Sequence, residues 1–422
     1  MAKKRIFAIM KIAELFQILN EIIHSPETLI KSRLSEKYFT RNRKMSFVNL
    51  LCFFFDMRKT SLQTRLNLFF KREKHSMMSE QALSKARNHF DHSPFETMVR
   101  RLVSEEYSGK NSTLTWHGYH VLADDGSYLQ LPKATELSEI FGTRGQGNHC
   151  VSAGVSVLYD VITGWPIDPA ITHSNMNERA ELMKHLDYLS GELPHIAEKS
   201  VLLIDRGYSS EEVFKAIESK RMKFLARCKS NYCKKTQMAP LGDSIVKLNH
   251  GLIVRVFKFA LPSGEIETLL TNLFDIPSEE LPKLYSKRWG IETAYHRLKN
   301  IICLENFSGK TENAIRQDFW ASMVLMISVA VFQKEANEKI ERAHRRKQNK
   351  HQYKASVGDL AVTLRDEFIF AVLRKNKILS IFKIRKIVAL LAYSKSPVRP
   401  ERSFPRHKNR NPAFNLNLKS HL

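Results

Sequence analysis

Four side chains that could grip a phosphate chain and a metal ion lie close together near residue 290. Tyr285, Arg288, Glu292 and Lys299 follow the spacing Y-x2-R-x3-E-x6-K. On a helix that turns about 100° per residue, these positions fall within an arc of roughly 60°. A phenol, two cations and one carboxylate would then share one stripe, which suits a metal ion beside a phosphate chain. The simpler interpretation is a surface ion-pair face.

A second, apolar stripe runs along the same predicted helix, roughly 90° away by the same arithmetic. It consists of Leu284, Ile291, Leu298 and Ile302. We therefore expect the helix to bury one edge in a core and to present the other edge to a cleft.

Two aspartates upstream could complete a set of carboxylates with Glu292. Asp125, in Ala-Asp-Asp-Gly-Ser, is predicted to end a first strand, and Asp205, in Leu-Leu-Ile-Asp-Arg-Gly-Tyr, to end a buried strand. Cleavage of a phosphodiester by two metals needs a few carboxylates that converge on ions about 3.5–4 Å apart, and Mg²⁺ prefers oxygen ligands. Each aspartate also has a simpler interpretation, a hairpin turn for Asp125-Gly126 and a helix cap for Asp205. The neighbouring Asp124 is an alternative on the opposite face of the strand.

The composition favours a soluble protein that binds a polyanion. Lys and Arg total 67 against 43 Asp and Glu, so the net charge of the 422 residues is +24. Basic residues are spread along the chain and do not flank an apolar helix, which favours nucleic acid over a membrane surface. The longest apolar run, 319–332, is shorter than the roughly 20 residues of a bilayer span and predicts a buried core helix. Five cysteines without a C-x2-C pair favour free thiols in a reducing cytoplasm.

The chain divides into three predicted regions. Residues 1–115 are predicted to be helical and basic, with helices after Ser46 and Ser79, and the second carries Lys85 and Arg87. Such helices could enter a DNA groove or could be solvated faces, and the sequence leaves both open. Residues 116–332 form the predicted catalytic domain. Residues 333–422 are predicted to be a basic helical region, including 368–392, that ends in a flexible tail from Ser394.

The middle region predicts an α/β fold with a mixed sheet. Residues 119–124 and 128–131 are expected to form a hairpin around Gly126-Ser127, and 150–159 a third strand. A helix at 178–189, an apolar central strand at 201–204, a helix at 210–220 and a strand at 223–227 follow. Three strands followed by alternating helix and strand are what an RNase H-like core would give. Residues 228–275, with strand-like runs at 252–259 and 266–271, are predicted to be an inserted β element.

Several motifs together resemble bacterial insertion-sequence DDE transposases that carry a β insertion before the glutamate. They are Asp-Gly-Ser followed by Leu-x-Leu-Pro at 129–132, Asp-Arg-Gly-Tyr at 205–208, and the Y-R-E-K spacing. Residues 304–310 and 317–319 also resemble the stretch after that signature. The resemblance runs from about 80 to 332, and the Y-R-E-K spacing is its most specific part.

The resemblance implies a site and its partners. Asp125, Asp205 and Glu292 would be the catalytic metal ligands for two Mg²⁺ ions, with Mn²⁺ as a substitute. Tyr285, Arg288 and Lys299, together with Arg206, would contact DNA. The substrates would be the inverted-repeat ends of the element and target DNA, handled by a homodimer in a bacterial cytoplasm. Residues 228–275 lack the Trp on which some relatives stack a flipped base, so Tyr232, Phe257 or Phe259 would have to replace it.

We therefore expect a DNA transposase that cleaves the ends of its element and joins them to target DNA. Two alternatives remain. One is an RNase H-like nuclease that cleaves without strand transfer, and the other is a non-catalytic DNA-binding protein derived from a transposase. Strand-transfer products would separate the two enzymes, and an intact set of three carboxylates argues against the binding protein.

Overall fold

The computed structural model describes most of the chain, and its residues group into two compact units. The described residues are 10–41, 43–56, 60–73, 77–108, 115–145, 150–229, 231–261, 263–345, 351–360, 364 and 386–398. One unit, here called the sheet unit, contains Val103–Leu129 and Ala153–His296. The other, the helical unit, contains Met10–Leu102, Gln130–Ser152 and the described residues from Arg297 onward. The predicted domain boundaries at 115 and 332 stay predictions.

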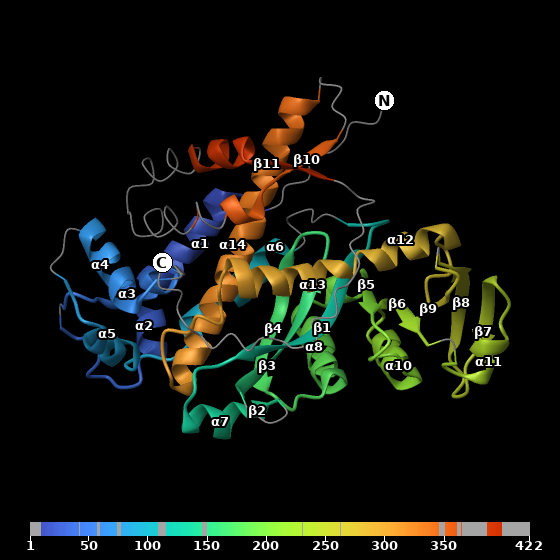
Figure 1. The fold of residues 1–422 in the computed structure, drawn as a ribbon, viewed down its shortest axis with the longest axis horizontal. Helices are drawn as coiled ribbons and strands as arrows, with labels where there is room; N and C mark the ends of the chain where they lie inside the picture. The colour runs from blue at the N-terminus through green and yellow to red at the C-terminus, as the bar shows by residue number, and fades with distance from the viewer. Residues whose placement is uncertain are drawn as a thin grey trace. The chain divides into compact units, whose positions relative to one another are not determined.

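A mixed sheet forms the core of the sheet unit, with strand order β4-β3-β1-β5-β6-β9-β8-β7 (Figure 1). β1 pairs in parallel with β5, and β5 in parallel with β6, while β4 is antiparallel to β3. Three neighbouring strands and then alternating strands and helices are the predicted RNase H-like order, so the fold class is confirmed. The strands are β1 (His120–Gln130), β3 (Cys150–Asp160), β4 (Trp165–His173), β5 (Ser200–Ile204), β6 (Lys223–Cys228), β7 (Gly242–Lys247), β8 (Ile253–Ala260) and β9 (Ile266–Thr271).

Apolar sequence explains which strands are central. All five residues of β5 are buried, and so are ten of the eleven in β3, as expected for strands covered on both faces. The inserted strands β7–β9 extend the same sheet, because β9 pairs antiparallel with β6. The helices of the unit are α8 (Glu178–Glu192), α9 (Pro194–Ala197), α10 (Glu211–Ser219), α11 (Lys234–Met238), the 3-10 turn η1 (Ser278–Glu280), α12 (Leu281–Ser286) and α13 (Trp289–His296).

The predicted hairpin around Gly126 is wrong, because β1 continues through it. Gly126 does not adopt the positive φ that a two-residue hairpin turn demands of glycine. Its role is close approach, since a Cβ at this position would lie 2.6 Å from Met176 Cε and 2.8 Å from Glu178 Oε1. Because β1 is one strand, β3 is the second strand of the sheet unit along the chain, and β4 is the third. β4 was not predicted from the sequence.

The helical unit is built around one long buried helix, α14 (Glu312–His344). By length and composition α14 could span a membrane, but 94% of its most apolar window is buried inside the protein. The predicted core helix at 319–332 is thus confirmed. The other elements are α1 (Ile12–His24), α2 (Pro26–Ser32), α3 (Phe47–Phe54), α4 (Leu62–Glu73), α5 (Glu80–Arg87), α6 (Ser93–Glu106), which runs on into the sheet unit, α7 (Thr135–Phe141), β2 (Thr143–Arg144), the π-helical turn η2 (Arg297–Ile301), β10 (Gln352–Ala355) and β11 (Lys395–Val398).

The predicted C-terminal region is only partly described. β10 and β11 form a two-stranded antiparallel sheet, and residues 386–393 are helical. Most of the predicted apolar and basic stretch 368–392 lies outside the described residues, and so does the predicted tail beyond 398.

Arg87 is buried and fastens α5 to α14. Its guanidinium donates to Ser308 Oγ at 2.8 Å and to Gln317 Oε1 at 3.1 Å, and it lies 3.4 Å from Asp318 Oδ1. Since the side chain is only 3% exposed, Arg87 does not belong to a DNA-facing surface of α5. Lys85 on the same helix is exposed.

We expect Arg87→Ala to lower the free energy of unfolding by about 3–5 kcal/mol, because it leaves the buried Asp318 carboxylate without its partner. Urea denaturation followed by circular dichroism measures the change. Lys85→Ala is the matched control on the same helix and should change stability by no more than about 0.5 kcal/mol. Equal effects of the two substitutions would show that the buried ion pair does not stabilise this unit.

Candidate active site

Parallel pairing brings Asp125 and Asp205 to neighbouring positions. The register of β1 and β5 runs from His120 opposite Ser200 to Ala123 opposite Leu203. Asp125 and Asp205 each lie two residues after a member of the last pair. They are therefore at the same level along the two neighbouring strands. Adjacent strands lie about 4.8 Å apart. Asp205 follows the end of β5 as predicted, whereas Asp125 lies inside the longer β1.

Arg288 links these aspartates to Glu292. Arg288 Nη2 donates to Glu292 Oε1 at 2.7 Å, four residues along the chain. Burial disfavours the charged guanidinium, but the neighbouring Tyr285 and the charges of Asp205, Asp125 and Glu292 outweigh it and raise the pKa of Arg288. One largely buried cation therefore hydrogen-bonds one of the predicted carboxylates and interacts electrostatically with the other two.

Asp125 is a largely buried carboxyl group with charged neighbours of both signs. Burial raises its pKa to about 6; Arg288 and the backbone N–H of Gly126 oppose the rise, while Glu178 and Glu292 add to it. The site therefore favours a further cation when Asp125 is ionised. Among the described residues, no three Asp, Glu, His or Cys side chains are close enough together to hold a metal ion.

Two tyrosines position the site. The Tyr285 hydroxyl donates to Asp205 Oδ1 at 3.2 Å, and burial together with the charge of Asp205 raises the pKa of this phenol. Tyr285 thus stays protonated and acts as a donor. The Tyr295 hydroxyl donates to the main-chain oxygen of Asp125 at 2.6 Å and fastens α13 to β1. Sequence reasoning missed Tyr295, although it lies one helical turn after Glu292.

The structure separates Asp124 from Asp125. Asp124 is only 3% exposed, and His185 Nε2 on α8 lies 3.6 Å from its Oδ2. His185 also pairs with Asp168, with 2.6 Å between Nδ1 and Oδ2. Burial raises the pKa of Asp124 to about 7. Because Asp124 faces this buried network and Asp125 faces Arg288, Asp125 is the better candidate ligand.

The signature is not one regular α-helix. α12 ends at Ser286, α13 covers Trp289–His296, and Arg297–Ile301 forms a π-helical turn. The apolar stripe is nevertheless buried at all four of its positions, Leu284, Ile291, Leu298 and Ile302. The calculation at about 100° per residue stops at the π turn, so it does not place Lys299 on the stripe of Glu292.

The remaining predicted DNA contacts have protein partners or neighbours. Lys299 lies in the helical unit, where burial lowers its pKa and Glu305 opposes that change. Arg206 Nη2 lies 3.5 Å from Glu265 Oε1. In the insertion, Phe257 and Phe259 stack with ring centroids 5.4 Å apart, and Tyr232 lies against Phe214.

Comparison with known proteins gives the class of the chain. The sequence profile of the transposase DDE domain matches residues 111–328, more than half of the 422 residues, so the chain belongs to this family. The protein y4zB of Sinorhizobium fredii, named as a transposase, is 25% identical over an alignment of 190 residues that covers 40% of this chain and 50% of that protein.

Two further proteins are more remote. A protein of Geobacillus stearothermophilus, named as a transposase for the insertion sequence element IS5377, is 27% identical over 73 residues, covering 17% of this chain and 19% of that protein. The chain thus spans half or less of the length of both relatives. A cryo-EM structure of a piggyBac transposase synaptic complex with hairpin DNA overlaps 88% of this chain and 85% of its own, at a TM-score of 0.47 and 13% identity.

Tyr295→Phe should lower the free energy of unfolding by about 1–2 kcal/mol, because the Asp125 main-chain oxygen loses its donor in a buried place. Urea denaturation measures it. Tyr393→Phe removes a hydroxyl from a side chain that is 88% exposed and serves as the control. Wild-type stability in Tyr295→Phe would mean that this hydrogen bond does not hold α13 against β1.

Proposed function

We propose that this protein is a DNA transposase of an insertion sequence. It would cleave DNA at the inverted-repeat ends of its element and join those ends to target DNA. One observation carries the proposal: Asp125 and Asp205 lie at one level on neighbouring parallel strands, and a single arginine hydrogen-bonds Glu292 and interacts with the charges of both aspartates. That arrangement lies in a chain that belongs to the DDE transposase family.

The donor chemistry fits magnesium. Asp125, Asp205 and Glu292 would offer carboxylate oxygens, which Mg²⁺ and its substitute Mn²⁺ prefer. Burial is the main cause of the raised pKa of Asp125, and a divalent cation would favour the ionised form that burial disfavours. When bound, two such ions would activate the attacking water or 3′-hydroxyl and stabilise the leaving oxygen. Glu292 could serve as a ligand through its second oxygen, or through both oxygens once the hydrogen bond from Arg288 to Oε1 is broken.

The chain's own residues would then position the DNA. Arg288, released from Glu292, could turn to a phosphate oxygen while staying charged, because its pKa is raised. Tyr285 would keep Asp205 in place through its hydroxyl. Lys299 and Arg206 are the further proposed phosphate contacts, and Arg206 would leave its ion pair with Glu265.

The charge supports DNA as the partner. A net charge of +24 favours phosphate contacts and strongly salt-dependent binding. Joining two ends requires both in one complex, so we propose a homodimer on paired ends, in a bacterial cytoplasm. The nuclease alternative predicts cut ends without joined products, and the binding-protein alternative predicts neither.

Mg²⁺-dependent cleavage of end DNA should fall by more than about 100-fold in each of the variants Asp125→Asn, Asp205→Asn and Glu292→Gln. Substitution of a residue that only supports a metal ligand typically costs less than this. Binding to the same DNA should persist, because cations make most phosphate contacts. Gel assays of cleavage and strand transfer, with binding measured by anisotropy, give both results. Asp187→Asn, an exposed carboxylate that pairs with Lys220, is the control. Full cleavage by Asp125→Asn would direct attention to Asp124.

Mg²⁺ affinity should depend on pH. A carboxyl group with a pKa of about 6 is mostly protonated near pH 5 and mostly ionised near pH 7, and a metal binds the ionised form. The apparent affinity should therefore rise about tenfold between those values. Calorimetry on the DNA-free protein measures it. In Asp125→Asn the rise of Mg²⁺ affinity with pH should disappear. If this variant kept the pH dependence of the wild type, a group other than Asp125 would be responsible for it.

A further inference from the structure

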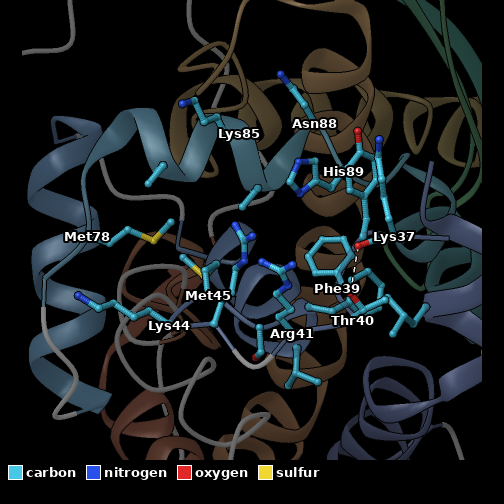
Figure 2. Close-up of a pocket in the computed structure, with 18 of the residues that line it drawn as sticks. Lys37, Phe39, Thr40, Arg41, Lys44, Met45, Met78, Lys85, Asn88 and His89 are labelled. Atoms are coloured by element: carbon cyan, nitrogen blue, oxygen red, sulfur yellow. Dashed lines mark hydrogen bonds between the residues drawn. The ribbon is translucent and has the colours of Figure 1, made fainter. Parts of the chain in front are cut away.

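The helical unit contains a basic cavity of about 1390 Å³ among α1, α2, α3 and α5 (Figure 2). Residues 23–29, 37–48 and 77–89 contribute to its walls. Sites for small molecules usually enclose about 300–1,000 Å³. The cavity is thus large enough for a ligand longer than a small metabolite.

Cations line the cavity from both sides. Lys37, Arg41, Arg43 and Lys44 come from the segment between α2 and α3, and Lys85 comes from α5. All five are exposed, and Figure 2 shows Lys85 on the helix across from Arg41 and Lys44. Among the described residues that line the cavity there is no Asp or Glu. Such a wall suits a chain of several phosphates.

Flat aromatic rings adjoin these cations. The rings of Tyr38 and His89 stack with centroids 3.9 Å apart and an interplanar angle of 13°. Lys37 Nζ lies 5.8 Å from the centroid of the Tyr38 ring. Partial burial and the charge of Arg43 lower the pKa of His89, so its ring is neutral near pH 7. Aromatic rings between cations are the arrangement on which unpaired bases stack while the backbone is held electrostatically.

We propose that this cavity binds an unpaired stretch of DNA strand, with its phosphates on Lys37, Arg41, Arg43, Lys44 and Lys85 and a base against Tyr38 and His89. A duplex keeps its bases stacked inside, where they cannot reach the ring of Tyr38. The proposal deepens the proposed transposase function by giving the helical unit its own ligand. It rests on that function only for the choice of DNA.

The test compares a fluorescent single strand of about 15 nucleotides with the same sequence as a duplex, on the full-length protein. Arg41→Gln combined with Lys44→Gln should weaken single-strand binding about tenfold or more and reduce the salt slope by about 1.4, which corresponds to two phosphate contacts. Lys71→Gln combined with Lys339→Gln removes the same charge from exposed positions outside the cavity and should leave affinity within about twofold. Equal losses in both double variants would overturn the proposal.

The aromatic part has its own variant. Tyr38→Leu should lower single-strand affinity about tenfold and leave duplex affinity unchanged, and Tyr38→Phe should keep both. Equal losses for strand and duplex would mean that the cavity recognises phosphates alone, and the proposal would fail. These binding measurements need no catalysis. Absence of end cleavage by the wild-type protein would therefore refute the transposase function and leave this result standing.

Discussion

One cation, Arg288, interacts with the charges of Asp125, Asp205 and Glu292, and the proposed site depends on it. Its guanidinium donates a hydrogen bond to Glu292 and interacts electrostatically with Asp125 and Asp205. Even so, burial raises the pKa of Asp125 to about 6, and the charge of Arg288 only partly opposes that rise. A divalent ion would favour the ionised carboxylate that burial disfavours, because bound metal and ionised carboxylates stabilise each other.

Rigid elements maintain this arrangement against mutual repulsion. Parallel pairing of β1 with β5 sets the two aspartates at one level, and the buried residues of β5 keep that strand in the centre of the sheet. Tyr295 fastens α13 to β1 through the main-chain oxygen of Asp125, and Gly290 lets the helix approach Val161, whose Cβ would lie 3.1 Å from a Cβ at that glycine. Apolar burial and a neutral hydrogen bond thus hold the strands and the helix that carry the charged groups.

Local patterns predicted much of this architecture. The apolar run before Asp205 indicated a central strand, and the spacing of Leu284, Ile291 and Leu298 indicated a buried helix edge; both are confirmed. The choice of Asp125 over Asp124 rested on a motif and stays a prediction; the two side chains differ in their neighbours, because Asp124 lies beside the buried His185 and Asp125 interacts with the charge of Arg288. These features depend on short-range periodicity, which a sequence displays directly.

Features that depend on long-range contacts could not be predicted. Gly126 resembled a turn, but strand pairing on both sides of β1 and the close packing of Met176 determine its conformation. The π turn at Arg297–Ile301 has no local signal in the sequence. The partners of Arg87 and His185 lie far away in the chain, so one seemed a candidate surface cation and the other went unnoticed.

Anomalous scattering from crystals soaked in Mn²⁺ tests the proposed metal site most directly. We expect one or two peaks within about 2.5 Å of carboxylate oxygens of Asp125 and Asp205, with a carboxylate oxygen of Glu292 also in the ligand set. Peaks at Asp124 and Asp168 beside His185, or none near Asp125 and Asp205, would contradict it.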